Sequence, residues 1–215
     1  MSMKKLVANQ LPEAYSTLEA VKSYLSTQET FHSISEVNWR KDFPYAPLVS
    51  FQIAWSKEGL YLYYRVEEKH IKAVHTSYNE PVYKDSCVEM FISPLGNEEY
   101  YNFEFNCIGN ILAGKKLRDE KARFTEQELS FIETLSSLPK GKTIDNQAGG
   151  RWDLTIFIPS WLIQKEELKQ GELLKANFYK CGDALTPSHY LSWSPINTSK
   201  PSFHQPQFFG EVILN

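Results

Sequence analysis

Two short strand-like runs, at residues 87–92 and 100–105, place the tightest constraint on the fold of this chain. Residues 93–97 join them with the sequence SPLGN, in which proline fixes φ and glycine permits the positive φ of a chain reversal. This arrangement predicts an antiparallel β-hairpin whose loop is longer than two residues.

The two runs of this hairpin each alternate between two faces, because successive side chains of a strand point in opposite directions. The apolar face is expected to build a core from these residues: Val88, Met90, Ile92, Tyr101, Phe103 and Phe105. The opposite face carries polar groups among aromatic rings: Glu89, Phe91, Tyr100, Asn102, Glu104 and Asn106. From the pattern alone, this second face is either an ordinary solvated face or a binding surface.

Most of the remaining regular structure is also predicted to be short strands. Alternation predicts strands at residues 51–56, 60–66, 152–158, 173–181, 189–194 and 208–214. Helical spacing predicts an amphipathic helix at 14–25 and shorter helical pieces within 118–130, near Leu129, Ile132 and Leu135, and at 160–168 behind a Ser160 cap. Many short strands and few helices predict an all-β fold, an antiparallel β-sandwich or a barrel.

The length of 215 residues is enough for one large β-domain. We expect a single domain over 1–215, with a helical extension at about 11–30 and an insertion at about 110–150, where the strand pattern is weakest and residues 138–150 resemble a surface loop. The net charge of −3 argues against a nucleic-acid partner, because a chain with a negative net charge is poorly suited to neutralise the negative phosphate backbone.

The first residues and the apolar runs indicate in which cellular compartment the protein is expected. No run is long enough to cross a bilayer, so no membrane association is expected. The first residues are basic, but no apolar stretch of signal-peptide length follows them. The sequence therefore predicts a cytoplasmic protein, or a periplasmic or extracellular one if a leader has been removed.

The cysteines and the isolated histidines give no metal-binding pattern. Cys87, Cys107 and Cys181 lie in strand-like runs without ligand spacing, and we expect buried free thiols. His70 and His75 lie in a polar stretch and are expected to face solvent. No cofactor or metal is assigned on this basis.

A series of short motifs follows in a fixed order between about residue 34 and residue 214. They are the W…LY…V run at 55–66, YKDSCVEMFI at 83–92, W…IP at 152–159, NFY at 177–179, SWSP at 192–195 and HQPQFFG at 204–210. In order and spacing they resemble the motifs of family 9 carbohydrate-binding modules, over nearly the whole chain.

The resemblance implies a β-sandwich that binds an oligosaccharide or polysaccharide at one edge, as part of polysaccharide utilisation and without catalysis. In the family two aromatic rings clamp a terminal sugar, and the matching positions here are Tyr83 and Phe203. The family's polar contacts correspond to Glu89, Glu104 and Asn106.

Members that bind plant polysaccharides carry tryptophan at both clamp positions and a basic residue at the position of Glu104. The smaller Tyr83 and Phe203 rings predict a weaker clamp or one suited to another sugar. Tyr179 and His204 are secondary candidates for the same site, whereas Trp39 and Trp193 are expected in the core. Calcium accompanies some family members, but no motif here matches well enough to carry it over.

An aromatic ring and a carboxylate together suit a sugar. The negative face of the ring attracts the slightly positive C–H groups of a pyranose. Carboxylates and amides bind its hydroxyls, and a charged acceptor makes the stronger hydrogen bond.

Three alternatives remain at this stage. Tyr83 and Phe203 could be loop aromatics that pack on the sandwich edge. Glu89 and Glu104 could serve a glycoside hydrolase, whose chemistry uses two carboxylates. A haem-binding sandwich would use Met90 with a histidine or lysine, although alternation directs Met90 into the core.

Overall fold

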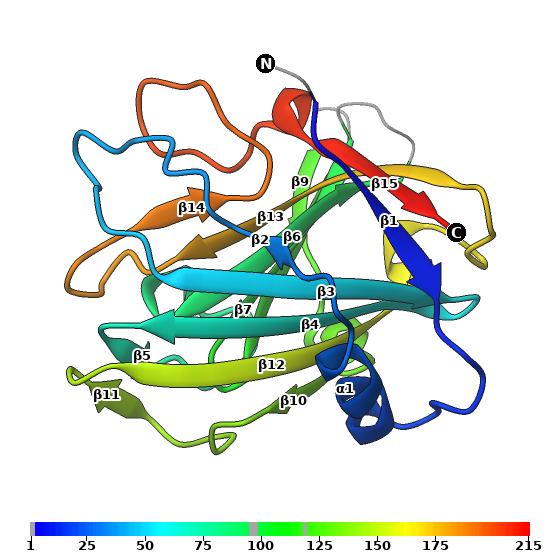
Figure 1. Ribbon diagram of the computed structural model, residues 1–215, viewed down its shortest axis with the longest axis horizontal. Coiled ribbons are helices and arrows are strands. Elements are labelled where there is room, and N and C mark those ends of the chain that lie inside the picture. The colour runs from blue at the N-terminus through cyan, green and yellow to red at the C-terminus, as the bar shows by residue number, and fades with distance from the viewer. Residues whose placement is uncertain (1–2, 95–98, 118–119) are drawn as a thin grey trace.

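The computed structural model describes residues 3–94, 99–117 and 120–215, and β-strands make up most of its regular structure (Figure 1). Most of the strands form one long curled sheet that folds over into two layers, and two further strands pair separately as a small second sheet. The first layer contains β15 (Gly210–Leu214), β13 (Leu173–Cys181), β6 (Cys87–Ser93), β7 (Tyr100–Asn106), β8 (Ile111–Leu117) and β9 (Glu120–Arg123), with β14 (Tyr190–Ser192) paired to β13. The second contains β3 (Leu48–Ser56), β4 (Gly59–Glu68), β12 (Gly150–Pro159) and β10 (Glu133–Ser136), with β2 (His32–Ser33) paired to β3.

Strand β1 (Lys5–Gln10) joins the two layers. It pairs in parallel with β15 through residues 5–8 and with β3 through residues 9–10. Figure 1 shows it running beside β15 and reaching the end of β3. The sequence did not predict this strand, because only Leu6 and Ala8 of its six residues are buried. The fold is therefore the predicted β-sandwich, with a mixed sheet that is mostly antiparallel.

The core lies between the two layers. Phe51 of β3 stacks on Phe178 of β13 with ring centroids 4.2 Å apart. Val88, Met90 and Ile92 of β6 are buried in the same cluster, as alternation predicted. Met90 therefore packs inside the sandwich, and burial of this kind contributes roughly 1.5–3 kcal/mol for each large apolar side chain.

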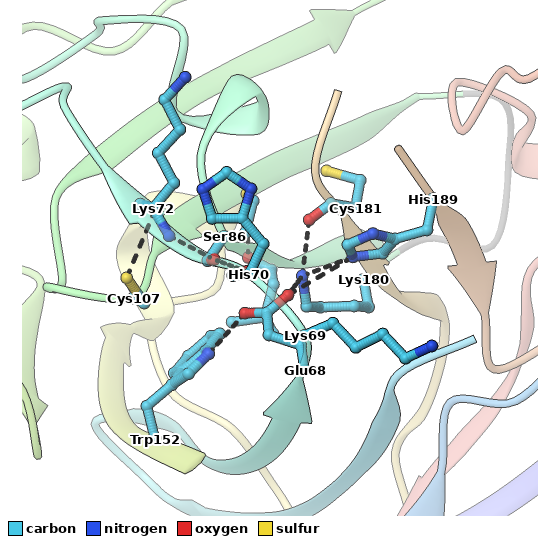
Figure 2. Close-up of polar contacts among 12 residues, drawn as sticks. Glu68, Lys69, His70, Lys72, Ser86, Cys107, Trp152, Lys180, Cys181 and His189 are labelled. Atoms are coloured by element: carbon cyan, nitrogen blue, oxygen red, sulfur yellow. Dashed lines mark hydrogen bonds and ion pairs between the residues drawn. The ribbon is translucent and has the colours of Figure 1, made fainter. Parts of the chain in front are cut away.

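A charged network also crosses this core, and Figure 2 shows its contacts. Lys180 of β13 places its Nζ 2.8 Å from Oε2 of Glu68 on β4 and 2.8 Å from Nε2 of His189. Trp152 of β12 donates from Nε1 to the other oxygen of Glu68 at 2.7 Å. Buried charges are tolerated when they are paired and hydrogen-bonded, so this network ties the two layers together.

The helices are shorter than predicted. Helix α1 (Leu18–Ser26) begins four residues after the predicted start, because the side chain of Thr17 caps it by accepting a hydrogen bond from Ala20 N at 3.2 Å. The helix predicted at 160–168 is only the 3₁₀ turn η2 (Ser160–Ile163), and Ser160 makes no side-chain cap. Two further 3₁₀ turns, η1 (Val82–Lys84) and η3 (Pro206–Phe208), precede β6 and β15.

Residues 110–150, expected to be poor in strands, contribute β8, β9, β10 and β11 (Ile144–Asn146), which pairs with β5 (Ile71–Ala73). Within 118–130, helix α2 (Glu126–Leu129) occupies a single turn that begins with a capping box of Thr125 and Glu128. This turn confirms the short helix expected within 118–130. Leu135 lies in β10, so the helical spacing predicted through Leu129, Ile132 and Leu135 was wrong at its last position. The predicted turn at residues 95–97 lies outside the described residues.

Trp39, Trp193 and the three free cysteines are buried, as predicted. The expectation that His70 faces solvent was wrong, because its ring is buried and its Nε2 lies 2.7 Å from Oδ1 of Asp145. Within the described part of the chain, none of the helices has the length and apolar character needed to span a membrane.

Candidate functional site

A pocket of about 570 Å³ lies over the outer face of the first layer. Its floor is formed by β6 and β7, and its walls by the β8–β9 arms, the residues after β13 and the loop at 201–204. Pockets of about 300–1,000 Å³ are typical of small-molecule sites. The pocket therefore has room for one or more sugar rings.

Strand register determines which side chains form the floor. Glu89 of β6 lies directly opposite Glu104 of β7, and Phe91 lies opposite Asn102 in the same way. Opposed residues of an antiparallel pair project from the same face of a sheet. Both carboxyl groups therefore belong to the pocket floor, although only 2% of Glu89 and 5% of Glu104 is exposed.

Burial changes the protonation of this floor. It raises the pKa of Glu104 to about 7, against smaller opposing effects from the Asn102 amide and the Arg123 charge. Burial first, and the neighbouring Glu104 second, raise the pKa of Glu89 well above its ordinary range. The floor can therefore hold protons near neutral pH, and each protonated carboxyl can donate one hydrogen bond as well as accept others.

Each floor carboxyl has one oxygen held by the protein. Asn102 Nδ2 donates to Glu104 Oε1 at 2.9 Å, and the Cys181 thiol donates to Glu89 Oε1 at 3.0 Å. The second oxygen of each group, Oε2, is buried and has no hydrogen-bond partner among the described residues. Buried polar atoms without a partner are rare, so these two oxygens are candidates for contacts with a ligand.

Two aromatic side chains from distant segments flank the pocket. Tyr83 comes from η1 and Phe203 from the loop before η3, and both are half-buried and line the pocket. Phe203 is held from behind, because its ring stacks on Tyr179 with centroids 4.2 Å apart and an angle of 10°. The Tyr179 hydroxyl also donates to the Phe203 carbonyl at 3.2 Å. The stack occupies one face of the Phe203 ring.

Hydrogen bonds fix the loop beyond this ring. The hydroxyl of Tyr100 lies 2.9 Å from Nδ1 of His204. Burial raises the pKa of Tyr100 to about 12, and burial followed by Lys121 and Lys116 lowers the pKa of His204. The tyrosine therefore donates to a neutral imidazole, which connects the loop to β7.

Asp183, after β13, also lines the pocket. Burial raises its pKa to about 6, while a hydrogen bond with Tyr190 and the charge of Lys84 lower it. Like Glu104, this carboxyl changes charge near neutral pH.

The sequence model of carbohydrate-binding family 9 matches residues 20–214, nearly the whole chain. The chain belongs to carbohydrate-binding family 9. No curated protein matches it.

Solved structures of related proteins agree with this assignment. A protein from Bacteroides uniformis ATCC 8492, provisionally described as carbohydrate-binding, is 37% identical over 100% of both chains, with a TM-score of 0.92. A family 9 module from Caldicellulosiruptor kristjanssonii in complex with glucose is 12% identical, covers 99% of this chain and 96% of its own, and has a TM-score of 0.60. The cellotriose complex of a family 9 module from the same organism is 12% identical, covers 98% of this chain and 93% of its own, and has a TM-score of 0.58. At 12% identity these last two show the fold alone.

The site residues expected from the family 9 motifs fall into two groups. The structure brings five of them to the pocket: Tyr83, Glu89, Glu104, Phe203 and His204. Tyr179 is fully buried behind Phe203. Asn106 lies away from the pocket lining, because its Nδ2 donates to Asp85 Oδ2 at 3.0 Å and to the His75 carbonyl at 2.8 Å.

Sequence reasoning missed the basic wall of the pocket. Lys116, Lys121 and Arg123 line it from β8 and β9. Lys121 and Arg123 fall in the charged segment 118–130, which was expected to contain a short helix, and Lys116 lies just before it. Asp183 and Tyr190 were missed because no motif surrounds them.

One group of acidic and sulfur side chains bears on the calcium that accompanies some family members. Among the described residues, Cys87, Glu89 and Cys181 form a group whose ligand atoms lie within 4.8 Å of one another. Calcium prefers six to eight oxygens, whereas this group offers two thiols and one carboxyl. The group does not fit calcium, and its sulfur ligands would favour a thiophilic ion.

Proposed function

We propose that this chain binds the end of an oligosaccharide or polysaccharide in the pocket between Tyr83 and Phe203, without catalysis. One observation carries the proposal: two aromatic rings from distant segments line the same pocket as the buried Glu89 and Glu104. The family 9 modules solved with glucose and cellotriose support it, because they have the same fold.

The chemistry of the pocket supports a sugar ligand. The Phe203 ring is held by Tyr179, so little conformational entropy is lost when a pyranose packs against it. Glu89 Oε2 and Glu104 Oε2 supply hydrogen-bonding positions that no described residue uses. A saccharide hydroxyl would satisfy each of them, and one buried hydrogen bond contributes about 0.5–1.5 kcal/mol.

Hydrolysis fits the same carboxyls less well. A retaining glycosidase needs one ionised nucleophile and one protonated acid at a separation of about 5 Å, with the bond between them. Burial raises the pKa of both Glu89 and Glu104, so neither is favoured as the anion. Both also form the floor beneath a ligand, and this placement suits binding. We therefore propose a binding module, which in a cell would serve polysaccharide utilisation.

Calorimetric titration with glucose, cellotriose and a wider oligosaccharide panel tests the proposal. We expect saturable binding by the parent chain and a loss of about fivefold or more in affinity for Tyr83→Ala and for Phe203→Ala, since stacking on an aromatic ring contributes on the order of 1 kcal/mol or more. Phe131→Ala is the matched control, because this exposed ring lies outside the pocket lining. Unchanged binding in both pocket variants would refute the aromatic clamp. Turnover of an aryl glycoside that Glu89→Gln abolishes would refute the non-catalytic assignment.

A further inference from the structure

The basic wall of the pocket carries an unusual arrangement of charges. Lys116 of β8 lies directly opposite Lys121 of β9, so the two lysines project from the same face of the hairpin. Like charges directly opposed across a β-ladder repel each other and destabilise the pair. An anion between them would remove this repulsion.

The same register directs both lysines toward the pocket. Tyr100 of β7 lies opposite Lys116, which continues the row across the sheet, and the Lys116 Nζ lies 6.0 Å from the centre of the Tyr100 ring. Tyr100 in turn contacts His204 in the loop that carries Phe203. Both lysines are close enough to this imidazole to lower its pKa. The lysine pair therefore faces the aromatic side of the pocket.

Arg123 extends the basic wall by one row. It lies opposite Gly114, which lies opposite Asn102 on β7. Gly114 lines the pocket and has no side chain, and the Asn102 amide lies over it: a Cβ at this position would come within 3.0 Å of Asn102 Oδ1. Arg123 also lies near enough to Glu104 to lower the pKa of that carboxyl. The guanidinium therefore acts partly on the pocket floor.

The acidic and basic groups occupy different parts of the pocket. Glu104 and Tyr100 are four residues apart on β7, which is about 13 Å along a strand. The Glu89–Glu104 row therefore lies well away from the Tyr100–Lys116–Lys121 row. Asp183, the remaining acid in the lining, follows β13 on the side of Glu89. One end of the pocket is suited to hydroxyl groups and the other to a negative charge.

We propose that the ligand is a saccharide with an acidic substituent, a uronate carboxylate or a sulfate ester, which lies between Lys116 and Lys121 while Glu89 and Glu104 contact its hydroxyl groups. This inference rests on the proposed function and adds the chemical class of the sugar.

An oligosaccharide array tests the inference, followed by calorimetry on matched ligands. The calorimetric set is cellotriose, cellotriose carboxylated at C6 and cellotriose sulfated at O6, and the array adds neutral, uronate and sulfated forms of other glycans. We expect the acidic forms to bind about tenfold more tightly than the neutral form, as one charge-assisted contact allows. Raising NaCl from about 50 to about 300 mM should reduce this preference, because the lysines are accessible to salt. Comparison of the carboxylated with the sulfated cellotriose shows whether the site prefers a uronate carboxylate or a sulfate ester.

The double variant Lys116→Gln/Lys121→Gln should lose the preference, binding acidic and neutral ligands with similar affinity. It should melt no lower than the parent, because it removes a repulsive pair. Lys142→Gln, an exposed lysine outside the pocket lining, is the control and should keep the preference. Equal binding of neutral and acidic ligands, or a preference that survives in the double variant, overturns the inference but leaves saccharide binding intact. Binding of no glycan on the array overturns both proposals.

Discussion

Glu89 and Glu104 lie directly opposite each other on β6 and β7, and the protein encloses both carboxyl groups. Burial raises the pKa of Glu104 to about 7 and that of Glu89 well above its ordinary range. In the unfolded chain a glutamate has a pKa of about 4.3. As pH rises from that value toward the folded pKa, the unfolded state loses a proton that the folded state keeps, so stability falls. The two carboxyl groups of the pocket floor therefore lower the stability of the fold near neutral pH.

Glu104→Gln should stabilise the protein at high pH. Glutamine is close in shape and can still accept the hydrogen bond from Asn102 through Oε1, but it cannot ionise. We expect the free energy of unfolding at pH 8 to exceed that of the parent by about 1–3 kcal/mol, and the two proteins to be nearly equal at pH 4. Urea unfolding at pH 4, 6 and 8 measures this difference. Glu29→Gln, which alters an exposed carboxyl, should show no such pH dependence, and a Glu104→Gln variant without a gain at pH 8 would contradict a buried, protonated floor.

The faces of this hairpin could be predicted from the sequence because alternation is a local property. Val88 and Met90 fall in the core and Glu89 on the other face, as the pattern requires. The position of Phe203 beside the same floor is not local. It depends on the path of a loop far along the chain, and only the resemblance to family 9 indicated it.

The β8–β9 wall could not be predicted because its sequence lacks the apolar alternation of a covered strand. Lys116 and Lys121 both point to the pocket side, and charged residues at a sheet edge look the same as those on a solvated helix. Backbone pairing of β8 with the preceding strand β7 decided the structure, and no apolar pattern in the sequence indicates that pairing. His70 shows the same limit: it is buried because Asp145, on another strand, supplies its partner.

Tyr179→Phe should weaken sugar binding although Tyr179 lies behind the pocket wall. Its hydroxyl donates to the carbonyl of Phe203, and loss of this bond frees the loop that positions the ring. One hydrogen bond contributes about 0.5–1.5 kcal/mol, so we expect affinity to fall by about twofold to tenfold. Calorimetric titration with the best ligand from the array measures the change. Tyr78→Phe, a half-buried tyrosine outside the pocket lining, should bind as the parent does, and equal affinities in both variants would show that the Tyr179 hydroxyl does not position the loop.

Lys180→Met should destabilise the sandwich strongly. The substitution leaves Glu68 as a buried charge without its cationic partner between the two layers. Removing one member of a buried ion pair costs about 3–5 kcal/mol. The double variant Glu68→Gln/Lys180→Met should recover much of this loss, because the glutamine oxygen can still accept from Trp152. Denaturant unfolding of the two single variants and the double variant gives the coupling energy between Glu68 and Lys180. A loss of less than about 1 kcal/mol in the unfolding free energy of Lys180→Met would mean that water reaches the pair.

His189→Gln should reduce the sensitivity of the fold to acid. Burial, followed by the Lys180 charge, lowers the pKa of His189 to about 2, whereas a histidine in the unfolded chain titrates near about 6.5. As pH falls below the unfolded value, the unfolded chain takes up a proton that the folded protein excludes, so stability present at neutral pH is lost. Glutamine does not titrate and can still accept a hydrogen bond from the Lys180 ammonium, which lies 2.8 Å from His189 Nε2.

Because the protonated carboxyl floor changes stability in the opposite direction over the same pH range, the quantity to measure is the difference in unfolding free energy between variant and parent. That difference should move in favour of the variant by about 1–3 kcal/mol between pH 7 and pH 4. A difference that stays constant with pH would show that His189 is accessible to protons in the folded state.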